Sequence, residues 1–172
     1  KMSRLPSSYL LPPLFVFIAG AALPGAQSDT PLLIEAAKTG DTDTLRTLLD
    51  RGRNVDGSEP DGTTALHWAA HRDDQATAEI LIDVGANIDA VTRYGVTPLS
   101  LAASNGSAVM IQTLLAGGAD PNHASPSLET PLMTAASTGS TAAIKLLLDH
   151  GAEVDAVESW HQQTALMWAA AQ

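Results

Sequence analysis

A short phrase recurs along this chain at an almost constant spacing of 33 residues. It contains a leucine followed three positions later by a pair of alanines, and the first alanine of each pair is Ala36, Ala69, Ala102, Ala135 or Ala169. The successive steps are therefore 33, 33, 33 and 34 residues. A fixed period of this length predicts a stacked solenoid, which offers a long surface for binding more than a pocket for chemistry.

The third copy shows how one repeat is expected to fold. Thr97 is a good helix N-cap, because its hydroxyl can accept a hydrogen bond from a free amide of the first turn, and Pro98 suits the first helical position. The short helix ends at Asn105 and Gly106, where glycine tolerates a left-handed backbone. A second helix is expected over residues 108–116. Two helices this short cannot bury their apolar faces alone, so the sequence predicts an all-α stack with turns or short hairpins between repeats.

Composition limits the classes of partner and chemistry. The 172 residues include no cysteine, which excludes disulfides, thiol nucleophiles and thiolate metal sites. The net charge of −10 argues against nucleic acid and against an anionic membrane surface as partners. We interpret this charge as favouring solubility, with a preference for basic partners as the alternative.

Residues 1–26 differ in composition from the rest and resemble a secretory signal peptide. A basic start with Lys1 and Arg4 precedes an uncharged apolar run over residues 14–23, and small residues follow. The run is too short for a membrane-spanning helix. An uncleaved anchor or a buried capping helix are the alternatives. We therefore expect a periplasmic or secreted protein that contacts membrane only if this segment stays uncleaved.

The repeated unit is similar to the ankyrin repeat. The phrase Thr-Pro-Leu-x-x-Ala-Ala, a later Leu-Leu helix and a Gly-Ala-Asp/Asn-x-Asp/Asn turn carry the resemblance, and Thr97–Leu99 with Gly118–Asn122 is one instance. The resemblance is to exported, bacterial-type ankyrin-repeat proteins. It implies an all-α ankyrin-repeat solenoid of helix-turn-helix units joined by hairpin-like loops, over residues 27–172. The expected repeats cover residues 28–60, 61–93, 94–126, 127–160 and, in part, 161–172.

The resemblance implies a protein-interaction scaffold with no catalysis, no cofactor and no small-molecule substrate. Partners of this family usually contact the hairpin tips and the exposed end of the first helix. Tyr94 and Trp160 are the strongest candidates, because a large aromatic side chain on a hairpin is costly to expose and useful as an anchor. The alternative is that each packs on the neighbouring hairpin. The predicted partner-binding residues are Tyr94, Trp160, Arg93, His71, Arg72, Asn105 and His161.

Other conspicuous residues are interpreted as structural. Trp68 and Trp168 occupy equivalent positions before the alanine pair, where inter-repeat packing is expected. His67 and His71 have a spacing that can hold zinc, but no glutamate follows His67, and no metal site is predicted. The resemblance implies instead that His67 bonds the Thr64 region. The acidic residues near Asp61 do not match a calcium loop.

The later repeats depart from the pattern. Leu128 and Gln162 replace the turn glycines of earlier copies, and one extra residue lies near Trp160, so the last two hairpins are expected to differ in shape. Gln172 falls within the first helix of the fifth copy, which predicts a C-terminally truncated fragment with Leu166, Met167 and Trp168 exposed. The alternative function is therefore a targeting arm of a larger enzyme or membrane-anchored protein.

Overall fold

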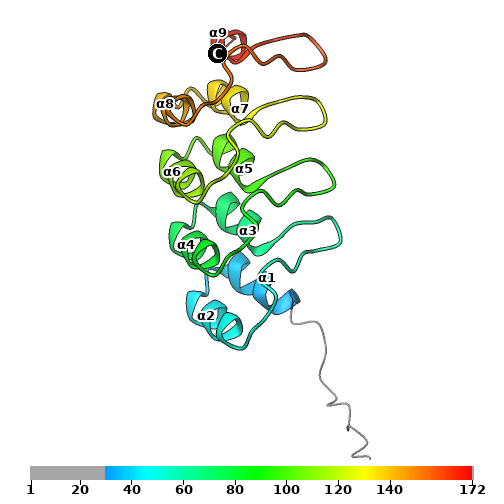
Figure 1. The fold of residues 1–172 in the computed structure, drawn as a ribbon, viewed down its shortest axis with the longest axis vertical. Coiled ribbons are helices and arrows are strands. Elements are labelled where there is room, and N and C mark those ends of the chain that lie inside the picture. The colour runs from blue at the N-terminus through cyan, green and yellow to red at the C-terminus, as the bar shows by residue number, and fades with distance from the viewer. Residues whose placement is uncertain (1–29, 172) are drawn as a thin grey trace, which may run out of the picture.

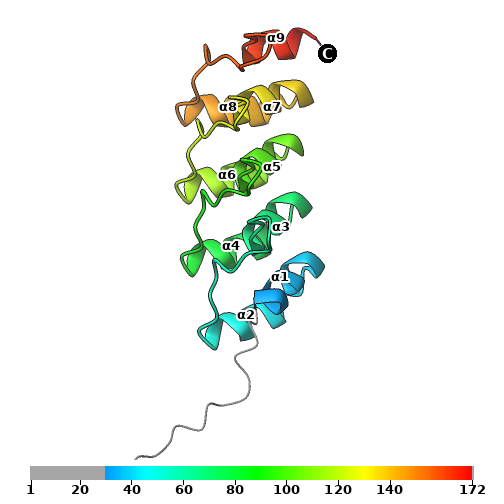
Figure 2. The ribbon, with the colours of Figure 1, turned by 90° about the vertical axis from the view of Figure 1, so that its right-hand side faces the viewer.

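The computed structural model describes residues 30–171, which form a slender stack of helix pairs (Figures 1 and 2). The predicted signal peptide over residues 1–26 lies outside this part of the chain. Within it there are nine helices and no β-strand, which confirms the predicted all-α repeat solenoid. The helices are α1 (Thr30–Thr39), α2 (Thr42–Asp50), α3 (Ala65–Arg72), α4 (Gln75–Asp83), α5 (Pro98–Ser104), α6 (Ala108–Ala116), α7 (Pro131–Thr138), α8 (Thr141–Asp149) and α9 (Ala165–Ala170).

The helices form two layers, with hairpin loops projecting from one side (Figure 1). The odd-numbered helices pack on one another along one layer, and α2, α4, α6 and α8 form the other. The alanine pairs of the first four repeats are buried at the helix contacts, together with the leucine that precedes each of them. Because alanine has almost no side chain, neighbouring helices approach closely, and the leucines fill the space between layers. No helix of residues 30–171 combines the length and the apolar character needed to cross a membrane.

The helix ends follow the predicted local signals. Thr97 Oγ1 accepts the Ser100 N–H at 3.1 Å, and Ser100 Oγ accepts the Thr97 N–H at 3.0 Å, so the two residues form a capping box. Asp73 stands where other copies have glycine and adopts the left-handed conformation with φ of 58°. Asp74 then caps α4 by accepting the Thr77 N–H. The second repeat thus keeps the turn despite lacking glycine.

The loops between repeats are linked by a ladder of side-chain to backbone hydrogen bonds. Asp56 accepts the Asn87 N–H at 2.7 Å and Asp89 accepts the Asp120 N–H at 3.0 Å. Asn122 accepts the Glu153 N–H at 2.8 Å. These acceptors are 33 residues apart, so each repeat aligns the next through the same bond.

The hairpins close in nearly the same way in each repeat. In the third hairpin (residues 92–96) the Thr92 N–H donates to the Val96 carbonyl at 3.0 Å, and in the fourth (residues 125–129) the Ser125 N–H donates to the Glu129 carbonyl at 3.0 Å. Leu128 adopts a left-handed φ of 64°, so the fourth hairpin keeps its shape without glycine. The expected change of shape is therefore wrong for the fourth hairpin.

The fifth hairpin does contain the extra residue. Its Glu158 N–H donates to the carbonyl of Gln163, five positions later, whereas the equivalent bonds of the third and fourth hairpins span four positions. Gln162 takes the left-handed conformation there with φ of 55°. Beyond this hairpin, Leu166 and Met167 are exposed as predicted, with Leu166 75% accessible. Trp168 is half-buried, which corrects the expectation of its exposure, because it packs against the core formed with α7.

Of the three junctions between neighbouring hairpins, two are joined by a single backbone hydrogen bond. The Arg93 N–H donates to the Asp61 carbonyl at 2.8 Å, and the Ser159 N–H donates to Ser127 at 2.9 Å. The equivalent bond between the third and fourth hairpins would need an N–H at Pro126, and proline has none. Those two hairpins meet instead by close packing of Gly95 against the Pro126 ring.

Candidate partner-binding surface

The hairpin side of the stack carries two adjoining hollows that share Tyr94 and Val96. The first, which we call the Trp68 pocket, has a volume of about 270 Å³ and is lined by Asp61, Thr63, Trp68, His71, Tyr94, Val96 and Leu101, among others. The second, the Trp160 pocket, has a volume of about 450 Å³ and is lined by Tyr94, Val96, Pro126, Ser127, Glu129 and Trp160, among others.

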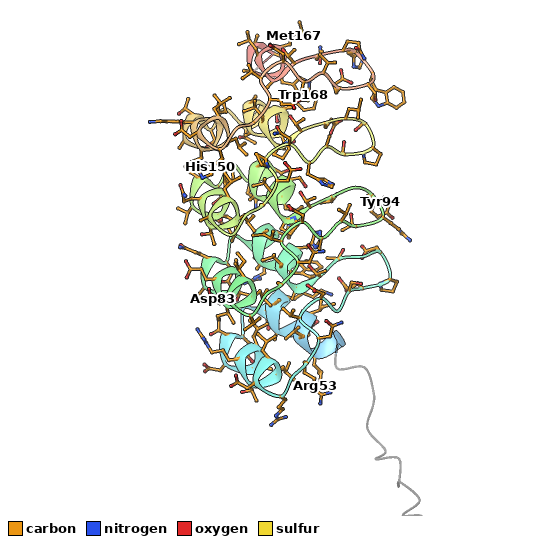
Figure 3. The ribbon with its side chains drawn as sticks, in the orientation of Figure 1. Arg53, Asp83, Tyr94, His150, Met167 and Trp168 are labelled. Atoms are coloured by element: carbon orange, nitrogen blue, oxygen red, sulfur yellow. The ribbon has the colours of Figure 1, made fainter. Side chains whose placement is uncertain are left out.

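Tyr94 and Trp160 both stand out into solvent. Their exposed fractions are 60% and 79%, so neither is buried against a neighbouring hairpin. Tyr94 lies at the outer end of its hairpin, away from the helices (Figure 3). The Arg93 guanidinium lies 4.7 Å from the centre of the Tyr94 ring and donates to its hydroxyl. Both aromatic side chains are exposed in the groove formed by the two adjoining pockets, and Arg93 lies over one face of the Tyr94 ring.

Trp68 is held by a set of polar contacts around its ring. Its Nε1–H donates to Glu59 Oε2 at 2.8 Å, and Lys38 Nζ lies 4.7 Å from the ring centre and 2.7 Å from Glu59 Oε1. The Lys38 hydrogen bond, followed by that of Trp68, holds the pKa of the Glu59 carboxyl below its ordinary value. The His71 ring meets Trp68 edge-on at 5.8 Å. Trp68 packs between repeats as predicted, and it also lines the pocket, which the sequence interpretation missed.

Trp168, its equivalent in the fifth repeat, lacks such a partner. Its Nε1 is buried and bonds nothing in residues 30–171. The corresponding glutamate, Glu158, is turned into the fifth hairpin, where it accepts the N–H groups of Trp160, His161 and Gln163. Burial raises the pKa of Glu158, but these backbone donors outweigh burial and leave the pKa below its ordinary value. Glu158 thus holds the enlarged loop that displays Trp160.

His67 occupies the structural position that the family resemblance implied. Its Nδ1 accepts the Thr64 N–H at 3.2 Å and lies 2.9 Å from the Thr64 hydroxyl. Its Nε2 lies 3.0 Å from the Val96 carbonyl, so the neutral ring carries its proton on Nε2. Burial lowers the pKa of His67, and the Val96 carbonyl offsets this only in part. Both ring nitrogens are occupied, and the described part of the chain holds no group of three or more metal-ligating side chains.

The other predicted residues lie at different distances from the groove. His71 lines the Trp68 pocket, and Arg93 contacts Tyr94. Asn105 is exposed, but its amide donates to the carbonyls of Ala70 and His71 at 3.1 and 3.0 Å, which closes the end of α3. Arg72 and His161 are also exposed, and neither lines one of the two pockets.

Several residues that line the pockets were not predicted to bind a partner, and two of them are large side chains of the helices. Trp68 and Leu101 stand directly before the alanine pair, a position that looks like pure core in the repeat pattern. The structure leaves both half-buried, with one side toward the hairpins. The size of Trp68, where three other copies have Glu, Leu or Thr, was the available signal.

The fold and this surface define the chain as a helical-repeat solenoid with an open groove along its hairpin side. A family model described as ankyrin repeats (three copies) matches residues 33–125 and 99–172, which together span most of the chain. The chain therefore belongs to the ankyrin-repeat family. Ankyrin repeats are generally protein–protein interaction modules and typically non-catalytic scaffolds. The comparison with curated proteins found no match.

Proposed function

We propose that this protein is a non-catalytic scaffold that holds a protein partner in the groove on its hairpin side. The observation that supports this most is the pair of exposed aromatic residues, Tyr94 and Trp160, that both line the Trp160 pocket. Interfaces draw much of their energy from a few such anchors that become buried on binding. Tyr94 also borders the Trp68 pocket, so a single extended partner segment can contact both hollows.

Replacing both Tyr94 and Trp160 with alanine is expected to weaken partner binding by at least about 30-fold, the effect of losing one interface anchor. Affinity capture from a periplasmic extract with the immobilised full chain supplies the partner, and interferometry with the purified partner gives the affinities. The matched control replaces Val84 and Val109, which are exposed apolar residues of the other layer. Equal affinity of the wild type and the aromatic double variant would place the partner elsewhere.

We also infer that the protein is exported, from the basic start and apolar run of residues 1–26. Fusing residues 1–29 to alkaline phosphatase that lacks its own signal is expected to yield active enzyme, because this phosphatase needs the oxidising periplasm for its disulfides. A fusion that begins at residue 30 is the control. An inactive enzyme in both fusions would reject export through this segment.

A further inference from the structure

We propose that the Trp68 pocket binds a cationic side chain, lysine or arginine, of the partner, an inference that rests on the proposed function. The pocket lies between the hairpins of the second and third repeats and the helices α3 and α5. Its walls combine the aromatic rings of Trp68 and Tyr94 with the carboxylate of Asp61. Its volume of about 270 Å³ leaves room for one long side chain from outside.

The two rings already bind cations of the chain itself. Lys38 Nζ lies 4.7 Å from the Trp68 ring centre, and the Arg93 guanidinium lies at the same distance from that of Tyr94. Neither cation is part of the pocket lining. An electron-rich ring face attracts ammonium and guanidinium groups, and the attraction grows when the cation is partly removed from water. Both rings therefore already attract a cation of the chain, and the parts of them that line the pocket can attract another.

Asp61 supplies a negative charge that would stabilise a cation bound in the pocket. It is the only acidic residue lining the Trp68 pocket, and one of its oxygens accepts the Thr63 N–H at 3.0 Å. The Thr63 backbone bond, with a smaller contribution from Arg93, holds the pKa of Asp61 below its ordinary value, so the carboxylate is charged at neutral pH. Of the nearby cations, Lys38 is paired with Glu59. The net charge of −10 favours the approach of a basic segment and opposes an acidic one.

The remaining walls suit the stem of the same side chain. Leu101 and Val96 give the pocket an apolar part beside the rings. Lysine and arginine carry a methylene stem that packs on apolar surface while the charged end keeps polar contacts. An entering side chain would lay its stem along Leu101 and Val96 and bring its charge to the rings and Asp61. A purely apolar side chain would leave the Asp61 carboxylate without an added partner.

The test is an NMR titration of the full-length, isotope-labelled chain with short Gly/Ser-flanked peptides that differ only at one central residue. That residue is lysine, arginine, acetyl-lysine or norleucine. We expect the lysine or the arginine peptide to shift the Trp68 indole N–H signal and to bind about five- to tenfold more tightly than the two neutral peptides. Equal binding by charged and neutral peptides would overturn the proposal in favour of a plain apolar pocket.

The variant Asp61→Asn localises the effect. Asparagine still accepts the Thr63 N–H, so the hairpin turn is kept while the charge is removed. Asp61→Asn is expected to abolish the preference for charged peptides, whereas Asp155→Asn, which removes the same charge outside the pocket, is expected to retain it. Equal losses in both variants would mean that net charge alone attracts the peptides, which would reject the pocket.

The inference and the proposed function fail in different ways. If Asp61→Asn leaves the affinity for the captured partner unchanged while the Tyr94 and Trp160 double variant loses it, only the cationic pocket is rejected. If the double variant binds the partner normally, the groove itself is rejected.

Discussion

Replacing Gly95 with alanine is expected to destabilise the protein by about 2–5 kcal/mol. Gly95 has a φ of +77°, a conformation that costs a residue with a side chain about 1–2 kcal/mol. A Cβ atom there would also lie far inside van der Waals contact with Cδ of Pro126. The proline ring cannot rotate away, so the third and fourth hairpins must separate, at a further cost of about 1–3 kcal/mol.

Gly118→Ala is the matched control for this substitution. Gly118 has a φ of +97°, and a Cβ added there meets nothing within 4 Å. It therefore carries the backbone cost without the hairpin clash. Urea unfolding followed by circular dichroism at neutral pH measures both variants, and the difference between them isolates the contact with Pro126. Equal losses of stability would show that the hairpins separate at no cost.

Replacing His67 with alanine is expected to lower the free energy of unfolding by about 2–4 kcal/mol. The imidazole is 1% exposed and joins the start of α3 to the third hairpin. Its removal leaves a cavity and deprives the Thr64 N–H of its acceptor. It also removes one of the two donors of the Val96 carbonyl, which keeps the Thr92 N–H. His67→Ser is the matched comparison, since Ser100 caps the equivalent helix of the next repeat. Serine should recover the bond to Thr64 but not the bond to Val96.

The same side chain makes stability depend on pH. Burial lowers the pKa of folded His67 below the ordinary value of 6.5, so the unfolded chain binds more protons between the two values. The contribution of the neutral ring is therefore complete above pH 6.5 and is lost as pH falls from 6.5 through the folded-state pKa. Urea midpoints measured across this window should fall in the wild type and change less in His67→Ser. Identical pH profiles would exclude His67 as the cause.

The architecture could be predicted from the sequence because each repeat contains the residues that begin, end and pack its own helices. The alanine pairs, the Thr97 cap with Pro98 and the second helix over residues 108–116 are all found where the pattern predicts them. These features depend on neighbours within a turn or two of helix, which the local sequence describes. Their regular repetition then fixes the stack.

Loop conformations and contacts between repeats were harder to predict. The pattern did not reveal that Leu128 would adopt a left-handed backbone, or that Glu158 would bind three amides of its own loop. The Trp68 pocket joins Trp68 to Tyr94, which belongs to the next repeat. These two residues are 26 positions apart in sequence, and the side chains at both positions vary between copies. The candidate anchors were thus predictable one by one, but the hollow between them was not.

The third and fourth hairpins of this groove meet at Pro126 without a backbone hydrogen bond. Hydrogen bonds tie the second hairpin to the third and the fourth to the fifth, while only packing joins the third to the fourth. Packing resists compression but, unlike a hydrogen bond, fixes no direction. This contact lies at the Trp160 pocket, which is lined by residues of both hairpins, including Tyr94 and Pro126. A partner seated in the Trp160 pocket would therefore contact both hairpins, and we expect its binding to hold them together.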